Sequence, residues 1–447
     1  MNVMSNGLNG VKKQFPAAAR ILEAALSAAD PAIAVKNGLR SLQGDGVLKG
    51  DQTIGLVAMG KASVPMARAA GDVLGEQIKG GIVIGKILPE ATESQLPGLT
   101  VLSGSHPVPD EGSLAAGKSV TGFLQNNRDL DLILFLISGG ASALVTRPVD
   151  GISLEDMKSV TKLLLGCGAS IDEINTVRKH LDQVKGGGLA RLAAPVPCVT
   201  LVLSDVPGDR LDMIASGPTV PDLTTYVGAT GVLEKYGLLD SVTDTVLLHL
   251  RNGCEGKIPE TPKPGDVIFR DSRVIIVGSL ERSTETAIQE AGHLGYQCER
   301  IQPILQGEAV EQGKRLGRFL ADKAALAQTG ARLCWIGGGE TTVTLGDGPT
   351  GKGGRNQELA LAAVDELDGA LNATLVTFAT DGDDGLSPAA GAIVTGNTKT
   401  AANLLGLDPS TYLARHDSYT FFSALDAAIV TGPTGTNVND LVLLLIN

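Results

Sequence analysis

Aromatic side chains are scarce in this sequence, and several marks of common functional classes are missing. Aromatic residues make up 3% of the chain, which leaves little for stacking on nucleic-acid bases. The formal net charge of −12 gives no attraction to nucleic acid or to anionic membranes. No apolar run approaches the length of a membrane span, and the N-terminus lacks the apolar core of a signal peptide. These absences predict a cytoplasmic protein that binds neither nucleic acid nor membrane.

The cysteine spacing and the absence of common hydrolase motifs exclude several further classes of protein. The five cysteines are widely spaced and form no CxxC pair, which argues against a disulfide framework and against a structural zinc site. The sequence contains no HExxH and no GxSxG pattern. Metalloprotease, zinc hydrolase and serine esterase functions therefore have no support.

The sequence is rich in short apolar runs that alternate with helical patterns. Hydrophobic residues make up 43% of the chain, and the alternation predicts an α/β fold with a mainly parallel sheet. An amphipathic helix is expected from about Gln14 to Arg40, punctuated at Asp30-Pro31. The expected strands are Thr53–Ala58, Gly81–Gly85, Leu99–Ser103, Asp131–Ile137, Cys198–Leu203, Arg273–Val277, Arg332–Ile336, Ala373–Ala379 and Leu441–Ile446.

The length of 447 residues suits two domains better than one. Helical and strand signals lapse near Thr261–Gly265, and a second alternating series begins at Arg273. We therefore expect an N-terminal Rossmann-like domain over residues 1–250, with helices flanking a mainly parallel sheet. A smaller C-terminal α/β domain is expected over residues 265–447.

Polar turns that directly follow apolar strands are the first places to look for a site, because open α/β sheets bind ligands at the carboxyl ends of their strands. Lys61 follows the first strand and opens a helix, where its charge can reach a phosphate. The segment Ser138–Ser142 offers two glycines that let the backbone approach an anion, with a serine hydroxyl at each end. Asp205 ends another strand and can hold Mg²⁺ or accept a proton from a substrate hydroxyl. Each feature also has an explanation without a ligand. Lys61 could be a solvated lysine, Ser138–Ser142 a tight turn, and Asp205 an ordinary turn residue.

A glycine-rich stretch in the second half could also carry chemistry. Gly346–Gly351 matches GxGxxG, but the acidic residues some twenty positions on lie in the following helix, so the match is weak as a dinucleotide fingerprint. A P-loop is also disfavoured, since Gly353 stands where the magnesium-binding hydroxyl belongs. Arg355 lies where this loop leads into a helix starting near Asn356, well placed for bidentate contact with phosphate or carboxylate.

Three further segments are polar. Ala379–Gly385 is most simply a polar turn, because it lacks the ligand pattern of an EF-hand. Glu173–His180 places Asn175, Arg178 and Lys179 within one helical turn, for which an exposed charged face is the plain explanation. Ser105–Asp110 is a rigid extended loop that holds His106.

Taken together and in order, these segments resemble the MOFRL-type (class II) glycerate 2-kinases, a family also labelled hydroxypyruvate reductase. The matching segments, which span most of the chain, are Met59–Ala62, His106–Glu111, Ile137–Leu144, Ile174–Leu181, Leu203–Asp209, Ala215–Thr219, Gly338–Val343, Gly353–Glu358 and Thr431–Asp440.

The resemblance implies ATP-dependent phosphorylation of D-glycerate to 2-phosphoglycerate, with Mg²⁺, in a cleft between two α/β domains. It also implies that Lys61 and Arg355 are needed for catalysis. From its place at a strand end, we expect Asp205 to act as magnesium ligand or base. The expected nucleotide-binding residues are Ser138, Gly139, Gly140, Ser142, Gly338, Glu340 and Thr341. The expected substrate-binding residues are Ser63, His106, Arg178 and Asn356, and the expected metal ligands are Asp205 and Asp209. Glycerate and ATP are the expected partners of a monomer or homodimer.

Three positions depart from the family's usual pattern and bear on the substrate pocket. Ala141 replaces a third glycine, and the segments Gly85–Leu88 and Asp384–Pro388 differ from the usual ones. Two rival functions stay open. An NAD(P)H-dependent hydroxypyruvate reductase is disfavoured by the poor dinucleotide fingerprint, and a non-catalytic sugar-acid sensor is disfavoured by the presence of both Lys61 and Arg355.

Overall fold

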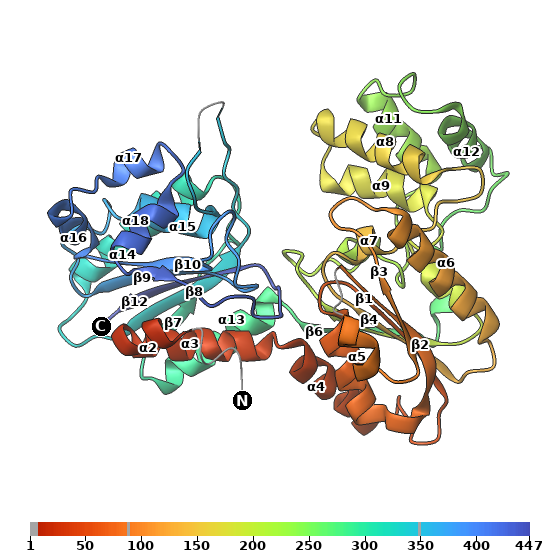
Figure 1. Cartoon of the computed structure of the whole chain (residues 1–447), viewed down its shortest axis with the longest axis horizontal. Coiled ribbons are helices and arrows are strands. Elements are labelled where there is room, and N and C mark those ends of the chain that lie inside the picture. The colour runs from red at the N-terminus through yellow and green to blue at the C-terminus, as the bar shows by residue number, and fades with distance from the viewer. Residues whose placement is uncertain (1–7, 87–89, 347–349) are drawn as a thin grey trace. The chain divides into compact units, whose positions relative to one another are not determined.

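The computed structural model describes residues 8–86, 90–346 and 350–447, and the chain divides into two compact units. The central unit is Pro31–Val277. The terminal unit combines the described residues up to Asp30 with Gly278–Asn447. Each unit contains one six-stranded sheet with helices packed against it (Figure 1).

The sheet of the central unit has the strand order β3-β2-β1-β4-β5-β6, the order of a doubly wound Rossmann sheet. Neighbours from β3 through to β5 run parallel. Its strands are β1 (Ile54–Met59), β2 (Ile78–Gly85), β3 (Leu99–Ser103), β4 (Leu132–Ile137), β5 (Cys198–Leu203) and β6 (Arg273–Gly278). Its helices are α4 (Pro31–Gly44), α5 (Ser63–Leu74), α6 (Glu111–Asn126), α7 (Ala141–Leu144), α8 (Leu154–Gly166), α9 (Ile171–Leu181), α10 (Gly188–Ala193), α11 (Tyr226–Lys235) and α12 (Asp244–Cys254), with short 3₁₀ turns at Gly75–Gln77, Glu90–Gln95, Ile214–Ser216 and Val267–Phe269.

The three middle strands of this sheet are buried along their whole length, which explains why each is a continuous apolar run. Their ends are aligned: Met59 pairs with Ile137, and Ile137 pairs with Val202. Because the strands are parallel, the turns that follow β1, β4 and β5 emerge at the same edge of the sheet. The side chains of these turns are therefore brought close together.

Helices α8, α9, α11 and α12 form a separate group within the central unit (Figure 1). They share a hydrophobic core of their own, which includes Met157, Val177, Tyr226 and Leu233. Helix α9 matters most for the site, because it carries Asn175 and Arg178.

The sheet of the terminal unit has the order β11-β10-β9-β12-β8-β7, in which only the β7–β8 pair runs parallel among the described pairings. Its strands are β7 (Gln297–Arg300), β8 (Leu333–Gly339), β9 (Ala373–Ala379), β10 (Gly391–Thr395), β11 (Ala428–Ile429) and β12 (Asp440–Ile446). Its helices are α2 (Asn9–Gln14), α3 (Pro16–Ala28), α13 (Leu280–His293), α14 (Ala309–Leu326), α15 (Arg355–Ala363), α16 (Thr398–Leu404), α17 (Pro409–Leu413) and α18 (Ser418–Ala424).

Strand β12 shows how this sheet is covered on both faces (Figure 1). Val442, Leu444 and Ile446 pack into the core that contains residues of α14 and α15. The alternate residues, Leu441 and Leu443 among them, pack into the core shared with α3 and α13. Successive side chains of a strand point to opposite faces, so one apolar run supplies both cores.

The predicted fold class is confirmed, and so is the position of every predicted strand. β3, β5 and β9 have the predicted bounds, and the others differ at an end by up to three residues. The predicted N-terminal helix is instead three helices, α2, α3 and α4, with breaks at Phe15 and around Asp30. None of the helices in the described part of the chain is long and apolar enough to cross a membrane.

The predicted division at residues 250 and 265 differs from the observed units in two ways. First, the sequence predicts that β6 opens the second domain, but β6 belongs to the first sheet, beside β5. The segment that resembled a linker is tied into the central unit, because Thr261 Oγ1 donates to Asp222 Oδ2 over 2.9 Å and the Asp222 amide donates to the Pro262 carbonyl.

Second, α2 and α3 pack in the terminal unit, although they precede the central unit in the sequence. The apolar face of α3, with Ile21, Leu22 and Ala25, covers the sheet that contains β12. Helical periodicity identifies an apolar face but gives no information about which sheet the face covers.

Candidate active site

The turn after β1 is built around Gly60 and holds Lys61 at the carboxyl edge of the central sheet. Gly60 has φ 122°, and a side chain there would overlap Ser138 of the neighbouring turn, so glycine is required. The Lys61 amide donates to the Gly139 carbonyl over 2.9 Å, and the Ala62 amide donates to Ser138 Oγ over 3.0 Å. These bonds fix the turns after β1 and β4 against each other.

Lys61 and His106 lie on either side of Gly140. A methyl group placed on Gly140 would lie 3.5 Å from Lys61 Cγ and 3.1 Å from His106 Cδ2. The Lys61 side chain is exposed, and within residues 8–86, 90–346 and 350–447 its ammonium has no hydrogen-bond or ion-pair partner. Burial lowers the pKa of His106, and the charges of Lys61 and Lys86 lower it further, so the imidazole is neutral at neutral pH. The pair offers a free cation beside an uncharged hydrogen-bonding group.

Asp205 completes this group at the end of β5. Its carboxylate fills the space beside Gly139, where any side chain would overlap Asp205 Oδ2. The structure thus places Lys61, His106 and Asp205 around the Gly139–Gly140 turn. A cation, an imidazole and a carboxylate around a glycine turn can bind an anion and accept the proton of a nearby hydroxyl.

A second part of the central unit's site lies where α9 meets the short helix α7. Ser142 Oγ and Ser216 Oγ are 2.8 Å apart, and Ser216 Oγ donates to Asn175 Oδ1 over 2.9 Å. Arg178 Nη2 donates to the Ser142 carbonyl over 3.3 Å. Burial lowers the pKa of Arg178 while Asp182 opposes this, and the guanidinium stays charged. Ser142, expected to bind nucleotide, has its hydroxyl paired with Ser216.

Two other expected site residues of the central unit, Ser63 and Asp209, make few of the described contacts. Ser63 is the first residue of α5 and is buried, with a hydroxyl that has no hydrogen-bond partner in the described part of the chain. Asp209 sits in the turn after β5 with φ 55°, and its amide donates to the Val206 carbonyl. Among residues 8–86, 90–346 and 350–447, no group of three or more His, Cys, Asp or Glu side chains is arranged to hold a metal ion.

In the terminal unit, Arg355 is the centre of an ion-pair cluster at the start of α15. Its Nε and Nη2 donate to the two carboxylate oxygens of Asp440 over 2.6 and 3.2 Å, and Nη1 donates to Glu340 over 2.7 Å. Burial lowers the pKa of Arg355, but the hydrogen bonds and charges of Asp440 and Glu340 outweigh it and raise the pKa overall. Burial raises the pKa of Asp440 to about 6, and Arg355 opposes that shift. Contacts with the described residues use three of the five guanidinium N–H donors, which leaves two for a ligand.

Gly338, Glu340 and Thr341, the expected nucleotide-binding residues of this unit, stand at and just after the end of β8. Gly338 is buried inside β8, paired with Leu441, and a side chain on it would overlap the Asp440 carbonyl. Close strand packing accounts for this glycine without any nucleotide. Glu340 follows the strand and pairs with Arg355, while Thr341 is buried.

Asp384 holds the start of α15 and was missed by sequence reasoning, which treated its segment as a polar turn. Its Oδ1 accepts the Asn356 amide over 3.0 Å, and its Oδ2 accepts the Gln357 amide and Gln357 Nε2, each over 2.9 Å. The helix begins after Gly354, which has no side chain to cap it. Asp384 therefore supplies the cap from a distant part of the sequence. Asn356, expected to bind substrate, is buried and bonded to this carboxylate.

We expect Asp384→Ala to lower the free energy of unfolding by about 3 kcal/mol, because it removes a helix cap and leaves buried amides unsatisfied. Urea denaturation measures the loss. Asp408→Ala is the matched control: Asp408 caps α17 by accepting the Thr411 amide at an exposed position, and its removal is expected to cost about 1 kcal/mol. Equal costs at the two positions would mean that burial of the Asp384 cap adds nothing.

Lys185 and Asp182 form a further buried ion pair that the sequence did not reveal. Lys185 Nζ donates to the carbonyls of Ser142 and Val145 and pairs with Asp182 Oδ2 over 3.0 Å. Asp182 also accepts Thr146 Oγ1 over 2.6 Å. This network holds the segment that follows the Gly139–Gly140 turn. Lys185 closely follows the basic end of α9, and nothing in the sequence there indicates that its side chain is buried.

The predicted motif Gly346–Gly351 includes residues 347–349, and the altered segment Gly85–Leu88 includes residues 87 and 88; these lie outside the described residues. Ala141 is buried at the first position of α7.

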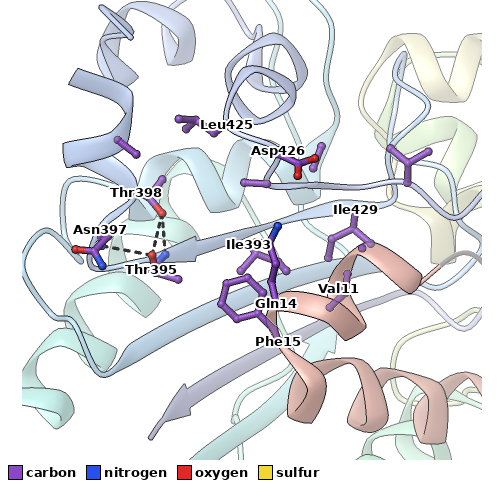
Figure 2. Close-up of a pocket in the computed structure, with 15 residues that line it drawn as sticks. Val11, Gln14, Phe15, Ile393, Thr395, Asn397, Thr398, Leu425, Asp426 and Ile429 are labelled. Atoms are coloured by element: carbon purple, nitrogen blue, oxygen red, sulfur yellow. Dashed lines mark hydrogen bonds between the residues drawn. The ribbon is translucent and has the colours of Figure 1, made fainter. Parts of the chain in front are cut away.

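A cavity of about 380 Å³ in the terminal unit lies apart from the residues discussed above (Figure 2). It is lined by Phe15 of α2's C-terminal end, by Ile393 of β10 and by Thr395, Asn397 and Thr398 among others. The last three are bonded among themselves: the Thr395 amide donates to Thr398 Oγ1 over 2.8 Å, and the Asn397 amide donates to Thr395 Oγ1 over 3.3 Å. No expected site residue lines this cavity.

Comparison with known proteins identifies the class of this two-unit α/β chain. Residues 17–251 match the family model described as a domain of unknown function, DUF4147, and residues 333–440 match that of the MOFRL family. The chain is 38% identical over 436 residues to a glycerate 2-kinase of Pyrococcus horikoshii, covering 96% of both chains. It is 40% identical over 434 residues to a D-glycerate 2-kinase of Thermotoga maritima, covering 96% of this chain and 97% of the other.

The structural comparison agrees. A crystal structure of glycerate kinase from Thermotoga maritima matches with a TM-score of 0.87 and 39% identity, covering 98% of this chain and 100% of that one. A protein of Agrobacterium vitis with the provisional name hydroxypyruvate reductase is 38% identical, covering 96% of this chain and 93% of the other. The chain belongs to the MOFRL-type glycerate 2-kinase family.

Proposed function

We propose that this chain transfers the γ-phosphoryl group of ATP to the 2-hydroxyl of D-glycerate and forms 2-phosphoglycerate. The observation that supports this best is the grouping of Lys61, His106 and Asp205 around the Gly139–Gly140 turn. Phosphoryl transfer needs cations and N–H donors around the transferred group and little covalent help from the protein. We infer glycerate as the phosphoryl acceptor from the relatives that are named glycerate 2-kinases.

Each side chain has a role that suits its chemistry. The exposed Lys61 ammonium would neutralise charge on the transferred phosphoryl group, and the two N–H donors left on Arg355 would contact the same group. Arg178, a cation with most of its donors unused in the described contacts, would hold the glycerate carboxylate. Residues of both units would then serve one reaction. Neutral His106 would bind a substrate hydroxyl without adding charge.

Mg²⁺ is the cofactor that this chemistry requires, and the carboxylate of Asp205 is suited to it. Mg²⁺ is commonly held by one or two carboxylates together with substrate phosphates, so a site with few protein ligands fits. Asp205 lies against the turn that would receive the phosphates. When bound, the ion would neutralise phosphate charge. Asp205 would otherwise serve as base for the 2-hydroxyl.

Asp205→Asn separates these roles. We expect the half-saturating Mg²⁺ concentration to rise ~10-fold or more, because losing even an outer partner of a metal ligand costs about that much affinity. A magnesium titration of initial rates measures it. If kcat falls and the titration midpoint stays fixed, Asp205 acts as base. Asp209→Asn, in the same turn, tests whether a second aspartate also binds the metal. If Asp205→Asn keeps the wild-type magnesium titration and the wild-type kcat, Asp205 is not part of the site.

The proposed reaction is tested by phosphorus NMR of the products formed from D-glycerate, ATP and Mg²⁺. The spectrum reports both turnover and the hydroxyl that carries the phosphate. Appearance of 2-phosphoglycerate supports the proposal, whereas 3-phosphoglycerate or unchanged ATP contradicts it. A parallel sample with hydroxypyruvate and NADH, followed by absorbance, tests the reductase function. We propose the cytoplasm as the location, where ATP is available.

A further inference from the structure

Two of the five cysteines face each other in the terminal unit, on neighbouring strands. Cys298 lies in β7 and Cys334 in β8, and the parallel pairing places them directly opposite each other. Both pack into the core shared with α3 and α13, so their side chains are on the same face of the sheet. Of the other three, Cys167 and Cys254 are exposed and Cys198 is buried in the central unit's sheet.

The backbone spacing at this pair suits a covalent link. Neighbouring strands lie roughly 4.8 Å apart, and disulfide-bonded cysteines have Cα atoms about 4.4–6.8 Å apart. Each thiol also shifts the pKa of the other, as expected for side chains that face each other at this spacing. The sulfur atoms therefore need little backbone movement to come within bonding distance.

The two thiols differ in a way that gives each a distinct role. Cys298 is partly exposed, and the facing Cys334 side chain lowers the pKa of its thiol. Cys334 is fully buried, and the facing Cys298 side chain and burial raise the pKa of its thiol. A reagent from solvent reaches Cys298 first, and Cys298 is also the better source of thiolate. Cys334 is placed to react second.

We propose that Cys298 and Cys334 are a reversible oxidation site that closes to a disulfide when the protein meets a hydroperoxide. The Cys298 thiolate attacks one peroxide oxygen, the O–O bond breaks, and the protein sulfur is oxidised to sulfenic acid while the peroxide leaves as hydroxide or alkoxide. The Cys334 sulfur then attacks the sulfenic sulfur, an S–S bond forms, and water leaves with the Cys334 proton. A dithiol reductant reverses the link.

This site is separate from the proposed kinase chemistry but shares a strand with it. β8 begins one residue before Cys334 and leads to Glu340, which accepts a hydrogen bond from Arg355. The link would fix β7 to β8 at the end of β8 far from Glu340. The inference does not depend on the reaction that the enzyme catalyses.

The test uses the full-length reduced protein, treated with hydrogen peroxide at near-equal concentration and then blocked with an alkylating agent. We expect peptide mass spectrometry to find a cross-linked pair containing Cys298 and Cys334, lighter than the reduced pair by two hydrogen atoms, that disappears after dithiothreitol. In Cys334→Ser, a sulfenic-acid probe should label Cys298 instead. In Cys298→Ser, neither product should form.

The matched control is the double variant Cys167→Ser, Cys254→Ser, which removes the two exposed cysteines and should form the cross-link as the parent does. The proposal is overturned if both thiols are still alkylated after peroxide treatment. It is equally overturned if Cys298 is converted to sulfinic or sulfonic acid while Cys334 stays a free thiol. Circular dichroism before oxidation confirms that each variant is folded, so each result bears on the chemistry.

Discussion

Lys61→Ala is expected to lower kcat on the order of 10²–10³-fold while the protein stays folded, the usual cost of removing one group that stabilises transition-state charge. The ammonium is exposed and has no side-chain partner in the described part of the chain, so its loss breaks no stabilising pair. What holds this turn is the Lys61 backbone, through the bond from its amide to the Gly139 carbonyl, and alanine keeps that bond. Steady-state kinetics with ATP and D-glycerate, together with a thermal melt, measure both effects.

Lys86→Ala is the control for a general loss of positive charge. Lys86 follows β2, and its charge lowers the pKa of His106 as the charge of Lys61 does, but it is not placed beside Gly140. If Lys61 meets the phosphoryl group directly, Lys86→Ala should cost far less activity than Lys61→Ala. Equal losses would mean that the two lysines act only through the charge felt by His106. A folded Lys61→Ala enzyme with near wild-type turnover would remove Lys61 from the site.

The strands and the turns after them were predictable because each feature is local in the sequence. A strand buried on both faces must be apolar throughout, so β5 appears as an unbroken apolar run with its observed bounds. Glycine marks the turn after β1, since a side chain at Gly60 would overlap Ser138. Parallel pairing then brings the turns after β1 and β5 to one edge of the sheet, the edge where open α/β sheets bind ligands.

The features that the sequence did not predict depend on contacts between residues far apart in the sequence. Asp384 caps a helix by accepting the amide of Asn356, 28 residues before it, and nothing in its own segment distinguishes a buried cap from a polar turn. Asp440 starts an apolar strand, and its role becomes visible only when β12 lies beside β8 and meets Arg355. The glycines before Glu340 are equally compatible with a loop in the sequence, because close strand packing and a flexible turn both require glycine. The same limit applies to β6, because its apolar run does not show which sheet it joins.

Arg355→Lys is the change that tests the terminal unit's part in the reaction, and we expect kcat to fall on the order of 10²-fold. Lysine keeps the charge but has one ammonium in place of a planar fork. It cannot bond both oxygens of Asp440, reach Glu340 and still point donors at a ligand as the guanidinium does. Arg318→Lys is the matched control, because Arg318 makes the same bidentate contact with Glu366 over 2.9 and 3.0 Å on an exposed surface of the same unit. That variant should keep full activity.

The combined variant Lys61→Ala, Arg355→Lys decides whether the two residues act on the same group. If both residues contact the transferred phosphoryl group, the second substitution should lower kcat/KM less in the presence of the first than it does alone. The first substitution has already weakened the stabilisation of the transition state. The losses in kcat/KM would then be smaller together than the product of the two single effects. Fully multiplicative losses would mean that Lys61 and Arg355 serve separate steps. An active Arg355→Lys enzyme would go further and reduce Arg355 to a residue that, with Asp440 and Glu340, only holds its own unit together.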